Sequence, residues 1–224
     1  MSRIFRGLLL AAVALGVFGA RADMEGAQDA LALQTGAPRV STEADRLLNR
    51  LSLRRSAAHD GLDWIIIRGG VVSFYYLPNA NLGKIEKRLR NRSLPIAREY
   101  RDLFTNKAYP IESRISARLQ FLLSRVEDIL GMRPLIPSID IKTLRNRDDL
   151  RARCRQLMGG QADYKSFYVH SLSTIFASEK DIVDSIIAHE MAHAVMDHYF
   201  MVPPPSMAAE LLAIHVDEHL ERDD

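Results

Sequence analysis

Apolar and polar residues recur along the chain with spacings that predict both strands and helices. The clearest strand signal is "DWIIIRGGVVSFYY" (63–76), in which two runs of β-branched and aromatic residues meet at Gly69-Gly70. A glycine pair tolerates the positive φ of a tight turn, so we expect a β-hairpin here. Two later stretches also favour strands, because "IPSIDIKTL" (136–144) alternates and "SFYVHSLSTIFAS" (166–178) has the composition of one or two short strands.

Apolar residues at helical spacing predict five longer helices. We expect them at 79–91, at 111–130, from Asn146 or Asp148 to Met158, at 179–199 and at 206–221. The helix at 111–130 is the most regular, with Gly131 as its stop signal and six apolar residues on one stripe: Ile115, Leu119, Leu122, Leu123, Val126 and Leu130.

The start of the helix at 179–199 has its own local signal. Ser178 is the expected N-cap, and Asp181 follows three residues later in a capping-box arrangement. Pro203-Pro204-Pro205 then separates this helix from the last one. No internal repeat is present, and the order of the elements indicates an α+β fold.

The first 22 residues, "MSRIFRGLLLAAVALGVFGARA", have the three parts of a secretory signal peptide. Arg3 and Arg6 form the charged start, and the apolar stretch from Gly7 to Ala20 is too short for a stable membrane anchor. The small-x-small pattern before position 23 predicts cleavage after Ala22. We therefore expect an exported protein, periplasmic or secreted, with no stable membrane insertion after signal removal.

The mature chain divides into a lead segment and one domain. Residues 23–60 are expected to be a mobile lead segment, because they are rich in Ala, Gly, Gln and Pro up to Val40. We expect a short helix in "STEADRLLNRLSLRR" (41–55). Residues 61–224 are expected to form a single domain, which is long enough to bury a sizeable core.

Charge and cysteine content exclude some classes of function. After removal of residues 1–22 the chain holds 27 basic and 28 acidic residues, so nothing in its net charge favours a nucleic-acid partner. The basic run Lys84–Arg101 is interpreted as a solvated helix face. Cys154 is the only cysteine, which rules out an internal disulfide, and its place in "RARCRQL" favours a structural role.

In the stretch "IIAHEMAHAVMDHYF" (186–200), two histidines and a glutamate, His189, Glu190 and His193, interrupt an apolar run that is expected to be a buried helix. Residues four apart lie on one helix face, so His189 and His193 can hold one metal ion between their imidazoles. Glu190 follows His189 by one residue, so its side chain lies close enough to reach a water molecule on the metal without binding the metal. A zinc ion lowers the pKa of such a water, and a carboxylate takes its proton as the water attacks a carbonyl. The motif therefore predicts a Zn²⁺ site with Glu190 as general base.

With the strand-like segment before it and the helix after it, the His-Glu-x-x-His motif resembles the zincin metallopeptidases, and more closely their glutamate-ligated branch, the gluzincins. The resemblance covers about Phe167 to Leu220. The metzincin extension needs a glycine at 196 and a histidine or aspartate at 199, where this chain has Met196 and Tyr199. The resemblance implies a zincin-like fold: a small sheet with an edge strand, an active-site helix and a C-terminal helix that carries an acidic ligand.

That last helix offers Glu210, Asp217 and Glu218 as third ligand. Glu210 is favoured, because an antiparallel return at about 1.5 Å per residue brings it to the height of His193. The segment "ELLA" also looks like the family's Glu-x-x-Ala pattern. Many relatives place an aspartate four residues after the ligand glutamate, where this chain has Ile214. Asp217 remains open, either as a group that orients a ligand or as the true third ligand.

Other polar residues near the motif have alternative interpretations. Asp197, four residues after His193, is placed to orient it, while His198 is interpreted as a helix-end histidine. His215 and His219 have metal-pair spacing, but their charged neighbours indicate an exposed face. Three side chains are candidates for stabilising the oxyanion: Tyr168, His170 and Tyr199.

These observations favour an exported zinc-dependent peptidase of the gluzincin type, with His189, His193 and Glu210 on zinc, Glu190 as base, and a peptide or protein as substrate. One alternative is a zincin-fold binding or structural module that retains zinc without proteolysis. The other is a helical interaction protein in which the motif is accidental.

Overall fold

The computed structural model describes residues 53–57, 61–90, 94, 106–159 and 163–222. The chain divides into two compact units, residues 1–53 and 54–224, and the described residues other than Leu53 belong to the second unit. The expected signal peptide, the predicted cleavage site and most of the lead segment lie outside the described residues. Of the expected lead segment, residues 53–57 form a strand. Within the described part of the chain, no helix combines the length and the apolar character needed to cross a membrane.

The described unit is built on a six-stranded sheet with the order β1-β2-β3-β4-β6-β5. Its strands are β1 (Leu53–Ala57), β2 (Asp63–Gly69), β3 (Val72–Tyr76), β4 (Ile139–Leu144), β5 (Ser166–Val169) and β6 (Thr174–Ser178). The central strand β4 is parallel to both of its neighbours, whereas β2 pairs with β3, and β5 with β6, in antiparallel fashion. The sheet is therefore mixed, and β5 lies at one of its edges.

The predicted hairpin is confirmed, with its turn one residue later than expected. Gly69 is the last residue of β2, and the tight turn is made by Gly70 and Val71. Gly70 has a φ of 68°, which a residue without a Cβ adopts at little cost. Gly69 is needed for another reason, because a Cβ there would lie 1.7 Å from the hydroxyl oxygen of Ser116 on the helix beneath the sheet.

The five longer helices occur where apolar periodicity predicts them, with shifted ends in several cases. They are α4 (Leu82–Leu89), α6 (Ile111–Leu130), α7 (Arg147–Met158), α8 (Asp184–Tyr199) and α9 (Ser206–His219). The bounds of α6 match the prediction, and Gly131 ends it in the left-handed conformation. Asn146 is the N-cap of α7, since its side chain accepts a hydrogen bond from the backbone N–H of Asp149. The fold is α+β, as predicted.

The predicted N-cap of α8 is wrong. Ser178 ends β6, and the helix begins only at Asp184, after a turn. Ser178 Oγ does accept a 3.2 Å hydrogen bond from the backbone N–H of Asp181, as a capping box would, but this bond closes the turn. Asp184 is fully buried and forms an ion pair of 2.6 Å with Arg118 of α6. The first residue of α8 is therefore the one that pairs with the buried Arg118. Arg118 is 66 residues earlier in the sequence, so local sequence signals do not reveal this pair.

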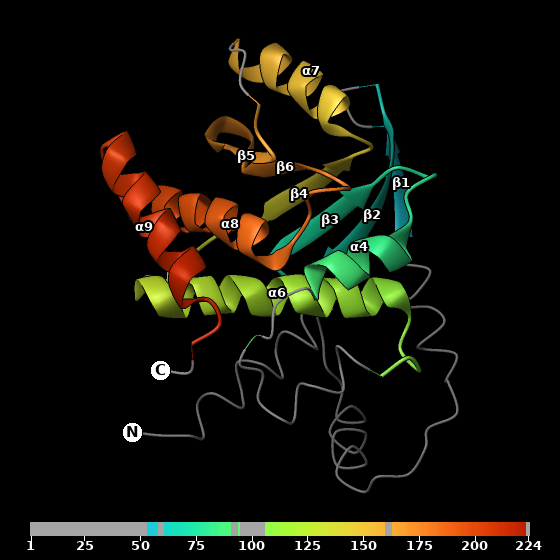
Figure 1. Ribbon diagram of the computed structural model, residues 1–224, viewed down its shortest axis with the longest axis horizontal. Coiled ribbons are helices and arrows are strands. Elements are labelled where there is room, and N and C mark those ends of the chain that lie inside the picture. The colour runs from blue at the N-terminus through green and yellow to red at the C-terminus, as the bar shows by residue number, and fades with distance from the viewer. Residues whose placement is uncertain (1–52, 58–60, 91–93, 95–105, 160–162, 223–224) are drawn as a thin grey trace, which may run out of the picture. The chain divides into compact units, whose positions relative to one another are not determined.

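Helices cover both faces of the sheet (Figure 1). On one face, α4, α6, α8 and α9 bury the larger apolar core, to which α6 contributes Ile115, Leu119, Leu122, Leu123 and Val126. On the other face, α7 packs against β4 and β6 over a smaller cluster. Cys154 belongs to that second cluster and is buried, so its position agrees with the expected structural role.

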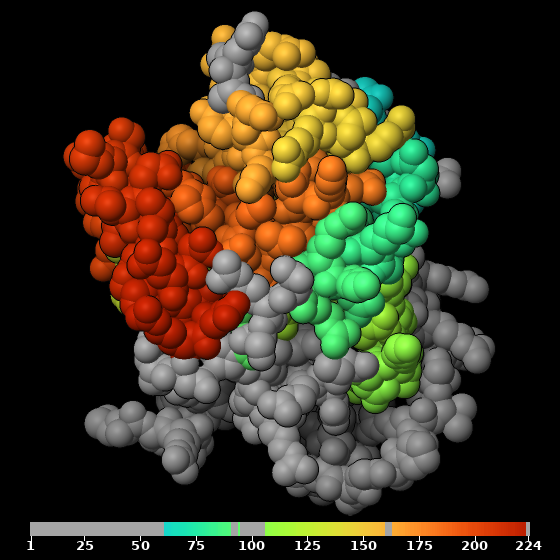
Figure 2. All heavy atoms as spheres, viewed as in Figure 1, coloured from blue at the N-terminus to red at the C-terminus, as the bar shows by residue number. Residues whose placement is uncertain are grey.

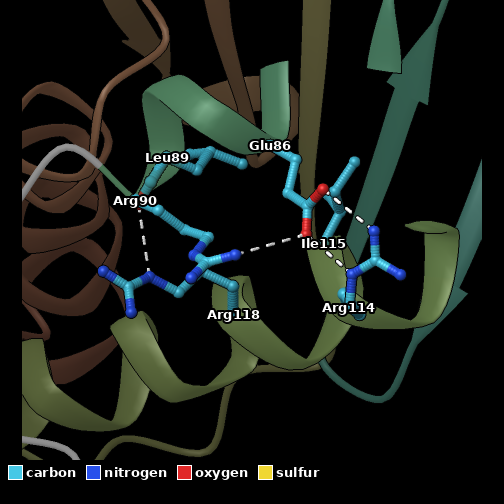
Figure 3. A pocket seen from close by; sticks show the side chains of 6 residues that line it. All are labelled: Glu86, Leu89, Arg90, Arg114, Ile115 and Arg118. Atoms are coloured by element: carbon cyan, nitrogen blue, oxygen red, sulfur yellow. Dashed lines mark hydrogen bonds and ion pairs between the residues drawn. The ribbon is translucent and has the colours of Figure 1, made fainter. Parts of the chain in front are cut away.

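Arginines of α6 form hydrogen bonds and ion pairs with neighbouring helices of the larger core (Figure 3). Arg114 binds both carboxylate oxygens of Glu86 on α4, at 2.7 and 3.0 Å. Arg118 donates to the backbone carbonyl of Leu89, at the end of α4, as well as to Asp184. Arg118 therefore connects the end of α4 to the first turn of α8, the helix that carries the His-Glu-x-x-His motif.

Candidate metal centre

The His-Glu-x-x-His motif lies in the middle of α8, which packs against β5, β6, α6 and α9. Small and apolar side chains fill the buried face of the helix: Ile187, Ala188, Met191, Ala192, Ala194 and Val195. His189 and His193 lie on another face, four residues apart, with their Nε2 atoms 3.3 Å from each other. Helix geometry alone brings the two imidazoles together.

Glu210 comes to the two histidines from α9. Its two carboxylate oxygens lie 3.4 Å from His189 Nε2 and 3.4 Å from His193 Nε2, respectively. Ala213 and Val216 of α9 are fully buried, and α9 packs directly against α8 (Figure 1). Ala213 is the small residue of "ELLA", so the structure places it in the core, on the side of α9 that faces the rest of the domain.

Among the described residues, the group able to hold a metal ion consists of His189, His193 and Glu210, whose donor atoms lie within 4.8 Å of one another. Donor atoms about 2.0–2.1 Å from a tetrahedral zinc ion lie about 3.3–3.4 Å apart, which matches the closest distances in this group. Two imidazole nitrogens and one carboxylate are also a ligand set that zinc favours. The residues present therefore fit zinc, with room left for a fourth ligand, since Glu210 is 57% exposed.

Asp217 lies outside this metal-binding group. It is on α9, seven residues after Glu210, and its side chain is half-buried. The arrangement thus offers Glu210 rather than Asp217 to the two histidines. Glu218, the third acidic residue considered on this helix, is exposed and also lies outside the group.

Glu190 is buried beside the metal-binding group and is held from the edge strand. Its Oε1 accepts a 2.6 Å hydrogen bond from Ser166 Oγ, and the backbone N–H of Tyr168 also donates to the carboxylate. Burial raises the pKa of Glu190 above its ordinary value, while the Ser166 hydrogen bond and the nearby His189 act in the opposite direction. A carboxylate with a raised pKa accepts a proton more readily, as a general base must.

The histidines are disposed to bind as neutral rings. Burial lowers the pKa of His193, although the carboxylate of Glu210 opposes that shift. A lowered pKa keeps the imidazole neutral at neutral pH, and neutral imidazole is the form that donates a lone pair to a metal ion. The electrostatics of this position are therefore suited to a metal ligand.

Asp197 does not have the role expected for it. Its Oδ2 accepts a 2.7 Å hydrogen bond from the hydroxyl of Tyr168, and its Oδ1 contacts Nδ1 of His170. Asp197 therefore binds two of the three oxyanion candidates instead of orienting His193. Burial and the contact with Asp197 raise the pKa of Tyr168, so its hydroxyl stays protonated and donates.

The remaining polar residues lie apart from the metal-binding group. Tyr199 ends α8 and is half exposed, and His198 bonds through Nδ1 to the carbonyl of Ala194, one turn earlier in the helix. The rings of His215 and His219 lie against each other at an angle of 35°, and Arg222 donates to Nε2 of His219 at 2.7 Å. A guanidinium at this distance disfavours a metal cation at these two histidines.

Ser166 is a hydrogen-bond partner of Glu190 that the sequence did not predict. It opens the strand segment "SFYV", where a serine at a strand start is an ordinary choice. Its role follows from the packing of β5 against α8, which places its hydroxyl on a carboxylate 24 residues away.

Comparisons with protein-family models, with curated proteins and with solved structures find no match for this chain.

Proposed function

We propose that this protein is an exported zinc-dependent peptidase with a zincin-like domain of the gluzincin type. The observation that carries the proposal is the group formed by His189, His193 and Glu210, with N···N and N···O distances of 3.3–3.4 Å, next to the buried carboxylate of Glu190. These three residues would hold zinc, and Glu190 is the general base. Export rests on the signal-like residues 1–22.

Zinc, when bound, supplies a Lewis acid that polarises a carbonyl and makes water a stronger acid. The protein supplies the proton acceptor and its orientation. Ser166 and the backbone N–H of Tyr168 hold the Glu190 carboxylate in one position, so that its remaining lone pairs can receive a proton from attacking water. The same carboxyl can then return the proton to the departing amine of the substrate.

The position of β5 supports a polypeptide substrate. It is the last strand of the sheet, and β6 is its neighbour among the described strands. Since Ser166 and Tyr168 of this strand contact Glu190, its outer edge runs beside the candidate metal centre. An extended peptide can add to such an edge through backbone hydrogen bonds.

Apolar side chains flank Glu210 at the surface and also support a polypeptide substrate. Those exposed between the end of α8 and the middle of α9 are Tyr199, Met201, Val202, Met207, Leu211 and Ile214. On α9, Met207 and Ile214 lie about 40–60° around the helix from Glu210, and Figure 2 shows this helix, in red, at the surface. Residues 199–214 contain no lysine or arginine that would attract an anionic membrane. We assign this surface to apolar side chains of the substrate.

The decisive experiment compares wild-type protein with Glu190→Gln after both are loaded with zinc. Both should retain about one equivalent of zinc, because Glu190 is a base and not a ligand. A peptide-library digest should show cleavage by the wild type and a loss of about 10² to 10⁴-fold in the variant, the usual value of general-base catalysis. Glu112→Gln, on α6 and away from the metal centre, is the matched control and should cleave normally.

Two results would replace the proposal. If the wild type binds zinc tightly yet cleaves nothing, the chain is a zincin-fold binding or structural module, and Glu190 serves as a hydrogen-bond partner within it. If purified protein refolded with zinc retains well under one equivalent, the motif is accidental and both zinc-based functions are excluded.

A further inference from the structure

Large apolar side chains are exposed to solvent at the C-terminal end of α7. Leu157 and Met158, the last two residues of the helix, are 37% and 53% exposed. They follow Cys154 by three and four residues, so they lie on the same side of the helix one turn later. Cys154 is buried in the second apolar cluster. The apolar side of α7 therefore continues beyond this cluster into solvent.

Tyr164 adds a third apolar side chain at the same cluster, from the chain just before β5. It is 44% exposed, and its ring centroid lies 6.3 Å from that of Phe167. Phe167 is a buried member of the cluster that contains Cys154. The end of α7 and the start of β5 therefore expose their apolar side chains around one part of the core.

Basic side chains accompany these apolar ones. Arg155 and Lys165 are exposed, and neither forms an ion pair with another residue in the part of the chain that the structure describes. Arg151, one turn before Arg155, is by contrast paired with Asp148 and Asp163. Two cations therefore remain available to a partner. The basic and apolar side chains together are called the α7 patch: Arg155, Leu157, Met158, Tyr164 and Lys165.

The charge of α7 is opposite to that of the helices on the other face of the sheet. Helix α7 contains four arginines and two aspartates, whereas α8 and α9 together contain six acidic residues and no lysine or arginine. In Figure 1, α7 lies on one side of the sheet, with α8 and α9 on the other. An anionic surface is therefore attracted to α7 and repelled by the helices that carry the candidate metal centre.

We propose that the α7 patch binds the surface of an anionic lipid bilayer. Arg155 and Lys165 attract the lipid phosphates. The ring of Tyr164 lies at the level of the headgroups, as tyrosines at membrane interfaces do. Leu157 and Met158 enter the boundary of the acyl chains. A soluble anionic polymer would engage the two cations and leave the apolar side chains in water, so the combination favours lipid.

The contact is peripheral, and it gives the protein one orientation at a membrane. The metal-binding residues lie on helices of the opposite face of the sheet, so a bilayer at the α7 patch leaves them open to solvent. The inference does not rest on the proposed peptidase function, because lipid binding needs neither zinc nor cleavage.

The first test measures sedimentation of residues 23–224 with lipid vesicles, since the apolar stretch within residues 1–22 would itself bind lipid. Binding is expected with equal parts of phosphatidylglycerol and phosphatidylcholine, should weaken as salt is added, and should be slight with phosphatidylcholine alone. The double variant Arg155→Gln/Lys165→Gln should bind about 25-fold more weakly, because each cation near such a surface contributes about 5-fold. Lys84→Gln/Lys87→Gln, which removes the same charge from exposed positions of α4, is the matched control.

The second test separates a lipid surface from a soluble polyanion. Met158→Ala should weaken vesicle binding about 5-fold, because less apolar surface leaves water on binding. Met207→Ala, an exposed methionine of α9, is the control and should bind as the wild type does. If the double variant loses binding while Met158→Ala does not, charge alone makes the contact. The assignment to lipid is then wrong.

The third test locates the contact on the protein. Tyr164→Trp and Tyr199→Trp each place a tryptophan at a half-exposed position, and the natural Trp64 is buried and common to both. Vesicles with phosphatidylglycerol should shift the emission of Tyr164→Trp to shorter wavelength, and brominated lipid should quench it, with neither effect in Tyr199→Trp. The inference is overturned by a response of Tyr199→Trp alone, by equal binding to both vesicle types, or by no binding to either.

Discussion

Ser166 Oγ, at the start of the edge strand, lies 2.6 Å from Glu190 Oε1 on the motif helix. The bond joins two elements that are separated by β6 and a turn in the sequence, and it holds the carboxylate beside the two histidines. The proposed chemistry depends on the position of this carboxylate.

Ser166→Ala should lower kcat about 10-fold, because Glu190 loses one of the hydrogen-bond donors that orient it. This loss is only part of the rate acceleration that a general base provides. Zinc content should change little. The Ser166 hydrogen bond also lowers the pKa of Glu190, against the larger effect of burial. Its removal should therefore raise that pKa further and move the acid limb of the pH–activity profile to higher pH. A profile of kcat/KM against pH checks this, and an acid limb that moves the other way would refute it.

The third ligand is tested by comparing Glu210→Ala with Asp217→Ala. Glu210→Ala should weaken zinc retention severely, because it removes the only carboxylate in the metal-binding group. Asp217→Ala should weaken it by no more than about 10 to 100-fold, the usual loss for a residue outside the ligand set. Zinc competition with a chromophoric chelator measures both. The reverse order would make Asp217 the ligand.

Zinc binding should resist mild acid. Burial lowers the pKa of His193, so this ring stays neutral at a pH where an exposed histidine has begun to charge. Protons therefore compete with zinc at His193 at a lower pH than they would at a histidine that titrates in the ordinary range. A titration of zinc release against pH checks this expectation, and release that is complete before the pH reaches that range would contradict it.

The zinc-free protein should show the matching dependence of stability on pH. Because the pKa of His193 is lower in the folded than in the unfolded state, the unfolded state binds more protons as the pH falls through the ordinary histidine range. This group therefore makes the folded state less stable as the pH falls. Urea unfolding of zinc-free wild type and His193→Gln should show a weaker pH dependence in the variant.

The buried ion pair between Arg118 and Asp184 should support the start of the motif helix. Arg118→Ala removes the cation that pairs with the Asp184 carboxylate, which has no exposed surface. The free energy of unfolding should therefore fall by about 3–5 kcal/mol. Arg133→Ala, which breaks an exposed pair with Asp128, is the control and should cost less than about 1 kcal/mol. Urea denaturation measures the free energy of unfolding of both variants. Equal losses in the two variants would show that the buried pair does not stabilise the start of α8.

Local sequence determined much of this protein. The hairpin of β2 and β3, the full length of α6 and the two strands β5 and β6 follow from apolar periodicity and from glycine signals. The closeness of His189 and His193 follows from helix spacing. In each case the partners lie within one element or one turn, so backbone geometry alone sets their distance.

Only the tertiary structure decided the remaining features. Each of them depends on a contact between residues 24 or more positions apart in the sequence. These features are the parallel pairing of β4 with β3 and β6, the start of α8 at Asp184, and the hydrogen bonds from Ser166 to Glu190 and from Tyr168 to Asp197. Asp197 had a sequence neighbour, His193, at helical spacing, and yet it pairs with side chains of the strand packed on its helix. Periodicity indicates which face of an element is buried. It does not indicate which polar groups meet there, because that depends on how the elements pack.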